Sequence, residues 1–149
     1  HSSLVKWPVP LLHVQRRPAE RLFKTKFVQD KILNMVLFNH NLINDENRTI
    51  YFEPYSGDHS GDAFYSFVDA IKLIKDKRLP QQLDGLQTPV LIYYGQHDQL
   101  VPLNNMQSLN ALLENSQLFI DERAGHHPME DHPEGVLEQV IPFLKSNSH

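Results

Sequence analysis

The chain has 149 residues, of which 40% are hydrophobic and 21% are charged, a composition typical of a globular domain with a sizeable core. Its net charge of −4, without any basic stripe, argues against nucleic-acid binding. The absence of cysteine excludes disulfides, a thiolate nucleophile and cysteine-bound zinc and fits a cytoplasmic location, while no apolar run approaches the ~20 residues of a membrane span.

Residues 1–61 have an irregular pattern. Several prolines in residues 8–18 interrupt any regular element there. Apolar residues recur at helical spacing over residues 22–37, which predicts a helix. Residues 39–47 contain four asparagines, one aspartate and one glutamate, a composition that predicts a turn or loop. A Gly/Asp/Ser-rich stretch at residues 56–62 predicts a connecting loop.

Residues 62–149 show regular alternation of elements. Apolar positions from Phe64 to Ile74 predict a helix, and the unalternating apolar run Pro89–Tyr94 predicts a strand buried on both faces. A helix is expected after Pro102, a second strand at residues 117–121 and a last helix opening at Pro133. We expect Pro142 to bend or fray that last helix.

A strand, a helix and a second strand in this order predict a parallel crossover, and therefore an α/β protein. A central parallel strand needs a neighbour on each edge, and only one other strand is visible in the sequence. The sheet is therefore expected to be completed by residues outside this chain or by a second copy of it.

One acid and one histidine follow the two predicted strands. Asp98 comes four residues after Tyr94, and His126 comes five residues after Asp121. Loops at the carboxyl ends of neighbouring parallel strands lie side by side, so an Asp98–His126 hydrogen bond is expected. Such a bond orients the imidazole and stabilises its cation when it accepts a proton, as in a catalytic triad.

No nucleophile accompanies this pair. The chain has nine serines but no G-x-S-x-G motif, and the similar string Gly57–Gly61 has His59 at the position of the nucleophile. We therefore predict that the nucleophile lies outside this chain and that the chain alone is inactive.

Other polar and aromatic residues have two interpretations. Four histidines and three acids lie near one another in the sequence, but their spacing matches no metal-binding motif, so no metal is expected: His97, His126, His127, His132, Asp98, Glu130 and Asp131. We expect His127 and His132 to lie at the surface or in a substrate pocket. Five aromatic residues could line an apolar pocket or belong to the core: Trp7, Phe27, Phe38, Tyr51 and Tyr55.

These motifs resemble the C-terminal part of the α/β-hydrolase fold superfamily, in particular its esterase, lipase, haloalkane dehalogenase and epoxide hydrolase branches. Gly95–Pro102 is similar to the G-x-x-D-x-x-x-P segment that carries the acid. Gly125–Glu134 is similar to the G-H-x-P-x-x-E-x-P-E segment that carries the base, with Asp131 where glutamate is usual. Residues 1–61 resemble, more loosely, the helical cap, and residues 62–149 the C-terminal part of the core.

The resemblance implies a cofactor-free hydrolase in which Asp98 orients His126. The family's nucleophile elbow and its His-Gly stretch are both missing here, and both belong to the N-terminal half of the fold, which is therefore expected to be absent. The implied substrate is a small apolar ester or alkyl compound. A serine nucleophile would imply an esterase, lipase or thioesterase, and an aspartate a dehalogenase or epoxide hydrolase.

Two alternatives stay open. The chain could be a non-catalytic interaction module that pairs with a separate N-terminal half or with itself, because an uncovered strand edge requires a partner. These residues could also be one part of a longer protein whose remainder supplies the nucleophile.

Overall fold

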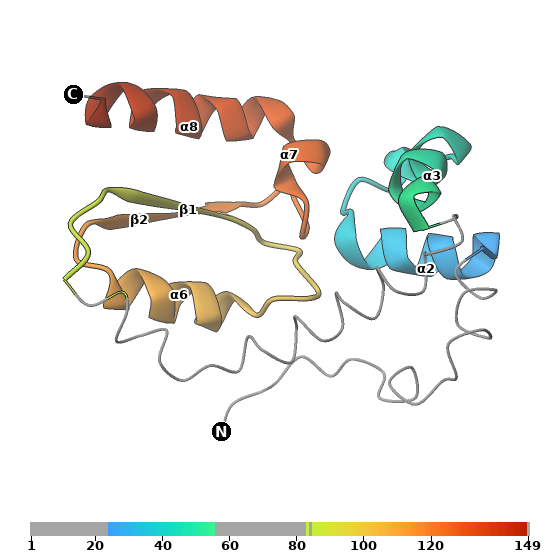
Figure 1. Cartoon of the computed structure of the whole chain (residues 1–149), viewed down its shortest axis with the longest axis horizontal. Helices are drawn as coiled ribbons and strands as arrows, with labels where there is room; N and C mark the ends of the chain where they lie inside the picture. The colour runs from blue at the N-terminus through green and yellow to red at the C-terminus, as the bar shows by residue number, and fades with distance from the viewer. Residues whose placement is uncertain (1–23, 56–82, 84, 149) are drawn as a thin grey trace. The chain divides into compact units, whose positions relative to one another are not determined.

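The computed structural model describes residues 24–55, 83 and 85–148, which are coloured in Figure 1. These residues fall into two units, one made of residues 24–33 and 43–55 and the other of residues 34–42, 83 and 85–148. Several predicted features lie outside the described residues: the boundary at residue 61, the loop at residues 56–62, the helix at Phe64–Ile74, and Trp7.

The first unit contains most of helix α2 (Lys26–Val36) and all of helix α3 (Asp45–Phe52), followed by the 3-10 turn η3 (Glu53–Tyr55). Helix α2 lies within the range predicted for it. Its Leu33 is fully buried, and Phe52 of α3 is 9% exposed. The Arg48 side chain links α3 to α2 by an ion pair with Asp30 at 2.6 Å, and it also pairs with Asp45 of its own helix at 2.6 Å.

The prediction of a loop over residues 39–47 is wrong in part. The 3-10 helix η2 (His40–Leu42) lies there, and α3 begins at Asp45. The reason is capping, because the Asn44 side chain accepts a hydrogen bond from the Asn47 N–H at 2.9 Å. Asp45 and Glu46 in the first turn also favour the helix, since negative charge stabilises its N-terminus. A composition that favours turns is also one that favours helix caps.

The second unit is built on two parallel strands, β1 (Val90–Gly95) and β2 (Ser116–Asp121). Both strands and their parallel pairing are as predicted. The register pairs Val90 with Ser116 and Gly95 with Asp121, so both strands end at the same edge of the sheet. In the described part of the chain the sheet has these two strands. β1 is therefore less buried than predicted, with Ile92 and Tyr94 as its well-buried side chains, because so narrow a sheet is only partly covered.

Helices cover both faces of this strand pair. Helix α6 (Leu103–Leu112) crosses from β1 to β2 on one face, and helix α8 (Pro133–Asn147) lies on the opposite face (Figure 1). Pro133 occupies the start of α8, as predicted. The predicted fraying at Pro142 is not observed, because α8 continues to Asn147. A short helix, α7 (Pro128–Asp131), precedes α8 and was not predicted.

A close backbone approach fixes the loop after β2 against the end of β1. An added Cβ at Gly95 would overlap the Gly125 carbonyl oxygen and lie 2.6 Å from that of Ala124. Glycine is therefore required at position 95, since no side chain fits at such a distance. The contact places the loop that carries His126 directly against the loop that carries Asp98.

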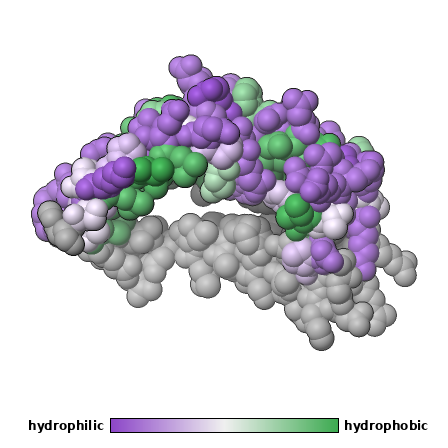
Figure 2. Space-filling model, turned by 90° about the horizontal axis from the view of Figure 1, so that it is seen from above, coloured by the Kyte–Doolittle hydropathy of each residue, from purple (hydrophilic) through white to green (hydrophobic). Residues whose placement is uncertain are grey.

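The surface of the described residues is largely hydrophilic, with several apolar patches (Figure 2). Exposed apolar side chains on α8 recur one helical turn or two apart, which places them on one face of that helix: Leu137, Ile141 and Leu144. Phe27, an aromatic residue expected in a pocket or in the core, is 71% exposed. No helix in the described ranges combines the length and the apolar character that a membrane span needs.

Candidate active site

Asp98 lies three residues beyond the end of β1, and its side chain is only 7% exposed. Its Oδ1 accepts hydrogen bonds from the backbone N–H groups of Leu100 at 2.7 Å and Val101 at 2.9 Å. Its Oδ2 lies 2.9 Å from His126 Nδ1. Both carboxylate oxygens therefore have defined partners, and the carboxylate cannot rotate without losing them.

The hydrogen bonds of Asp98 outweigh its burial. Burial alone would raise the pKa of Asp98, since it disfavours the charged form. The bonds from His126 and from the N–H groups of Val101 and Leu100 favour the carboxylate, and the pKa of Asp98 is lowered. Asp98 is thus a fixed negative charge next to an imidazole.

His126 lies five residues beyond the end of β2 and is 31% exposed, so its ring reaches solvent on one side. The contact predicted between His126 and Asp98 is present, at 2.9 Å. When Nδ1 carries the hydrogen that Asp98 accepts, Nε2 has a free lone pair and can accept a proton. This is the arrangement that a general base requires.

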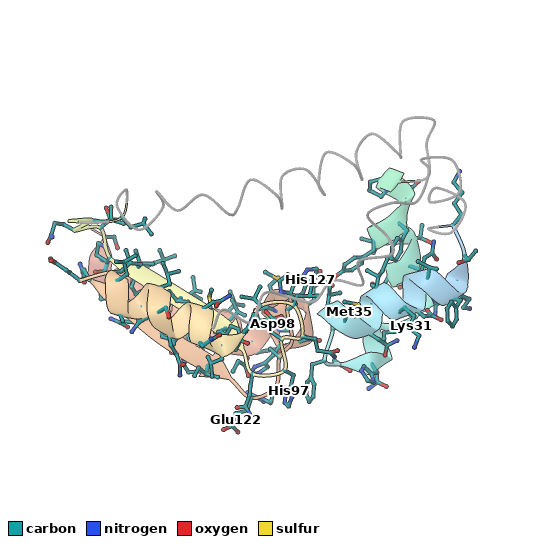
Figure 3. All side chains as sticks on the ribbon, turned by 90° about the horizontal axis from the view of Figure 1, so that it is seen from below. Lys31, Met35, His97, Asp98, Glu122 and His127 are labelled. Carbon is teal, nitrogen blue, oxygen red and sulfur yellow. The ribbon has the colours of Figure 1, made fainter. Side chains whose placement is uncertain are left out.

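Two further histidines lie on the same loops. His127 is 30% exposed, and its ring centroid is 5.3 Å from that of His126. Burial, followed by the proximity of His126, lowers the pKa of His127. The His97 ring stacks on Phe38 with centroids 3.9 Å apart, and its Nε2 lies 2.9 Å from the Glu122 carbonyl oxygen. Figure 3 shows His97, Asp98 and His127 close to one another beyond the ends of the strands.

His132 does not lie at the surface, one of the two positions predicted for it. Its side chain is 12% exposed, and Nδ1 lies 2.7 Å from Asp121 Oδ2. Asp121 also accepts hydrogen bonds from the Tyr93 hydroxyl and from the Arg123 N–H. Burial alone would raise the pKa of Asp121, but these hydrogen bonds favour its charged form, and its pKa is lowered. The pKa of Tyr93 is raised, by burial and by its hydrogen bond to Asp121. The physical reason is that Asp121, at the end of β2, is itself buried and requires hydrogen-bond donors.

The four histidines have separate partners rather than a common centre. In the part of the chain that the structure describes, no group of three or more acids and histidines is arranged to hold a metal ion. His126 and His132 each contact a different carboxylate, Asp98 and Asp121.

Two features of the site could not be read from the sequence. One is the Tyr93–Asp121–His132 cluster, whose members lie on a strand, at a strand end and at a helix start. The other is Asp131. Its carboxylate accepts hydrogen bonds from the backbone N–H groups of Phe38 and Asn39, which lie 93 and 92 positions earlier in the sequence. The sequence pointed to Asp131 only by its position in the Gly125–Glu134 segment, while the prolines that open α7 and α8 mark the first turns of those helices.

Comparison with known proteins agrees with this architecture. The family model for the alpha/beta hydrolase fold matches residues 15–133. The uncharacterized hydrolase YugF of Bacillus subtilis is 28% identical over 137 residues, which cover 92% of this chain and 48% of that protein. The pimeloyl-[acyl-carrier protein] methyl ester esterase of Pectobacterium atrosepticum is 33% identical over 76 residues, covering 51% of this chain and 30% of that protein.

A solved structure shares the fold. The meta-cleavage product hydrolase CumD of Pseudomonas fluorescens IP01 superposes with a TM-score of 0.69 at 20% identity and covers 83% of this chain and 47% of that protein. The chain thus spans half or less of the length of these relatives. Because the family model matches well over half of the chain, the chain belongs to the α/β-hydrolase fold family.

Proposed function

We propose that the protein is a hydrolase that cleaves a carboxylic ester or a similar bond, with His126 as general base and Asp98 as the residue that orients it. The observation that carries the proposal is the 2.9 Å contact between Asp98 Oδ2 and His126 Nδ1 at the edge where both strands end. The names of the relatives, which include a methyl ester esterase and several hydrolases, support the same class of reaction.

The proposed reaction needs a nucleophile from outside these 149 residues. For a serine, His126 Nε2 takes the hydroxyl proton while the oxygen attacks the ester carbon, and the imidazolium then gives that proton to the departing alkoxide. Water next attacks the acyl-enzyme, His126 accepts one of its protons, and the acid leaves as the serine is reprotonated. Asp98 stays ionised throughout and stabilises the imidazolium.

The substrate proposed is a small apolar ester. In this proposal, residues 1–61 act as the cap over the site, and residues 62–149 supply the acid and the base. Among the described residues the sheet has two strands and α8 exposes an apolar face, which supports a further requirement, namely that the remainder of the fold packs against this chain. A chain that binds that remainder without any catalysis is the rival function.

Covalent labelling of the nucleophile tests the proposal. The complete polypeptide that carries these residues is treated with diethyl p-nitrophenyl phosphate, digested, and the modified peptide is identified by mass spectrometry. We expect the label on a serine outside residues 1–149, formed about 100-fold more slowly in His126→Ala because the base is lost. If the nucleophile is an aspartate, turnover in heavy-oxygen water instead incorporates heavy oxygen into its carboxylate.

Two results would overturn the proposal. One is a label on one of the nine serines of this chain, which would place the nucleophile within residues 1–149 and not outside them. The other is a folded, complete polypeptide that takes no label and hydrolyses no ester, which would favour the interaction module.

A further inference from the structure

The side chain of Asp131, at the end of α7, joins two segments that are far apart in the sequence. Its Oδ1 accepts the backbone N–H groups of Phe38 at 2.9 Å and Asn39 at 2.8 Å. Its Oδ2 accepts the Gly125 N–H at 2.7 Å and also lies 3.0 Å from the Phe38 nitrogen. Gly125 directly precedes His126, so one carboxylate holds both the base loop and a segment that follows α2.

Residues 34–39, which are the end of α2 and the residues after it, contact both the base loop and the acid loop at further points. The Val36 carbonyl accepts the His127 N–H at 3.1 Å, and the Asn34 carbonyl accepts the Gln99 side-chain amide at 3.2 Å. The Phe38 ring stacks on His97, the residue before Asp98. These residues belong to the same compact unit as the sheet. The segment therefore supports both loops of the site at several independent points.

We infer that Asp131 is a positioning residue for His126, and that it acts by fixing the Gly125 peptide against the backbone of residues 38 and 39. Its catalytic consequence rests on the proposed function, whereas its structural consequence does not. The inference is chemically specific, because all three partners of the carboxylate are N–H donors.

A carboxylate is required at this position, and an amide of the same shape is not equivalent. Asparagine has one acceptor oxygen and one NH2 donor group. If its oxygen faced the N–H groups of Phe38 and Asn39, its NH2 would face the Gly125 N–H. In the reverse orientation, its NH2 would face the N–H groups of Phe38 and Asn39. Either orientation leaves at least one part-buried N–H, that of Gly125 or that of Asn39, without an acceptor, which is costly. The Gly125 peptide would then shift, and His126 with it.

The experiment compares Asp131→Asn with Asp131→Glu, which keeps the carboxylate, and with Glu134→Gln as a matched control at an exposed acid of the next helix. Ester hydrolysis by the complete polypeptide gives kcat and KM, and nitrogen-15 NMR gives the His126 Nδ1–H resonance. For Asp131→Asn we expect a shifted or broadened resonance and a kcat lowered about 10-fold to 100-fold with KM changed little, since small misplacements of a base are costly. Asp131→Glu and Glu134→Gln should stay within about threefold of the parent kcat, a difference that a modest change of position allows.

Other outcomes would overturn the inference. A folded Asp131→Asn variant with the parent resonance and the parent kcat contradicts it. If that variant does not fold, amide hydrogen exchange on the parent protein tests the inference. The amides of Phe38, Asn39 and Gly125 must all be protected, because the Asp131 carboxylate accepts all three. Exchange of these amides at unprotected rates refutes that role of Asp131. If the parent hydrolyses no ester, the proposed function fails while the NMR comparison still tests the positioning role.

Discussion

The two oxygens of Asp98 have different partners. Oδ1 accepts two backbone N–H groups of its own loop, and Oδ2 faces His126. The backbone bonds hold the carboxylate in place, so in the proposed reaction little reorganisation would accompany proton transfer to His126. The lowered pKa of Asp98, which the hydrogen bonds maintain against burial, keeps the carboxylate ionised near neutral pH.

Asp121 has a comparable environment but a structural role. It is 5% exposed at its side chain and bonded to Tyr93, Arg123 and His132. A carboxyl whose pKa is lower in the folded than in the unfolded chain binds fewer protons when folded. Its contribution to stability is therefore present above its unfolded pKa and is lost as the pH falls through its folded pKa, which lies below 3.8.

Replacement of Asp121 by asparagine tests whether its carboxylate makes this pH-dependent contribution to stability. At pH 7 we expect a loss of about 1–3 kcal/mol in the free energy of unfolding, because a buried network loses an acceptor. As the pH falls from about 5 to about 3, the difference between Asp121→Asn and the parent should shrink, because the parent loses the contribution of its carboxylate while asparagine does not titrate. Urea unfolding at several pH values measures this. Glu122→Gln, at an exposed neighbour, is the control, and a difference that stays constant with pH would contradict the assignment.

At the scale of elements, the start of α8 is shaped by His132. Gly135 is buried, and an added Cβ would overlap the Cε1 and Nδ1 atoms of the His132 ring. The ring cannot move away cheaply, because Asp121 holds Nδ1 at 2.7 Å. Glycine in the first turn of a helix is normally unfavourable, so its presence here has a packing reason.

Gly135→Ala should therefore destabilise the protein, by about 1–3 kcal/mol of overpacking. The same substitution in a His132→Ala background should be neutral or stabilising by up to about 1 kcal/mol, because the clash is gone and alanine has the better helix propensity. Thermal or urea unfolding of the parent, of Gly135→Ala, of His132→Ala and of the double variant measures the energetic coupling between positions 132 and 135. Equal effects in both backgrounds would show that the His132 ring does not set the constraint.

The elements differed in how well the sequence predicted them, for physical reasons. Pro89–Tyr94 and residues 117–121 were recognisable as strands because their apolar runs are bounded by proline, glycine or acid, and the parallel register then brought Asp98 and His126 together. Residues 39–47 misled because asparagine and aspartate serve equally in turns and at helix starts. His132 was misplaced because its partner, Asp121, is eleven residues away and its burial depends on how α8 packs. No local pattern encodes such a contact.

At the scale of the whole molecule, the proposed function has the chain supply two of the three groups of a triad, Asp98 and His126. Both lie in the unit that contains the sheet, at the edge where β1 and β2 end. The match to about half the length of its relatives and the absence of a G-x-S-x-G motif support the proposal that the nucleophile comes from polypeptide outside these 149 residues.

The proposed function requires the Asp98–His126 pair to work as a catalytic unit. The complete polypeptide is assayed for hydrolysis of p-nitrophenyl butyrate as His126→Ala, as Asp98→Asn and, for a matched control, as His127→Ala, whose imidazole is the adjacent one and is equally exposed. In Asp98→Asn, the new amide would keep its oxygen toward the Leu100 and Val101 N–H groups and turn its NH2 toward His126, which selects the wrong tautomer.

We predict that His126→Ala and Asp98→Asn each lower kcat by about 10³-fold to 10⁴-fold, while His127→Ala stays within about tenfold of the parent. If His126→Ala retains the parent kcat in a folded protein, or if His127→Ala loses as much activity as His126→Ala, the pair is not the catalytic unit and the account fails.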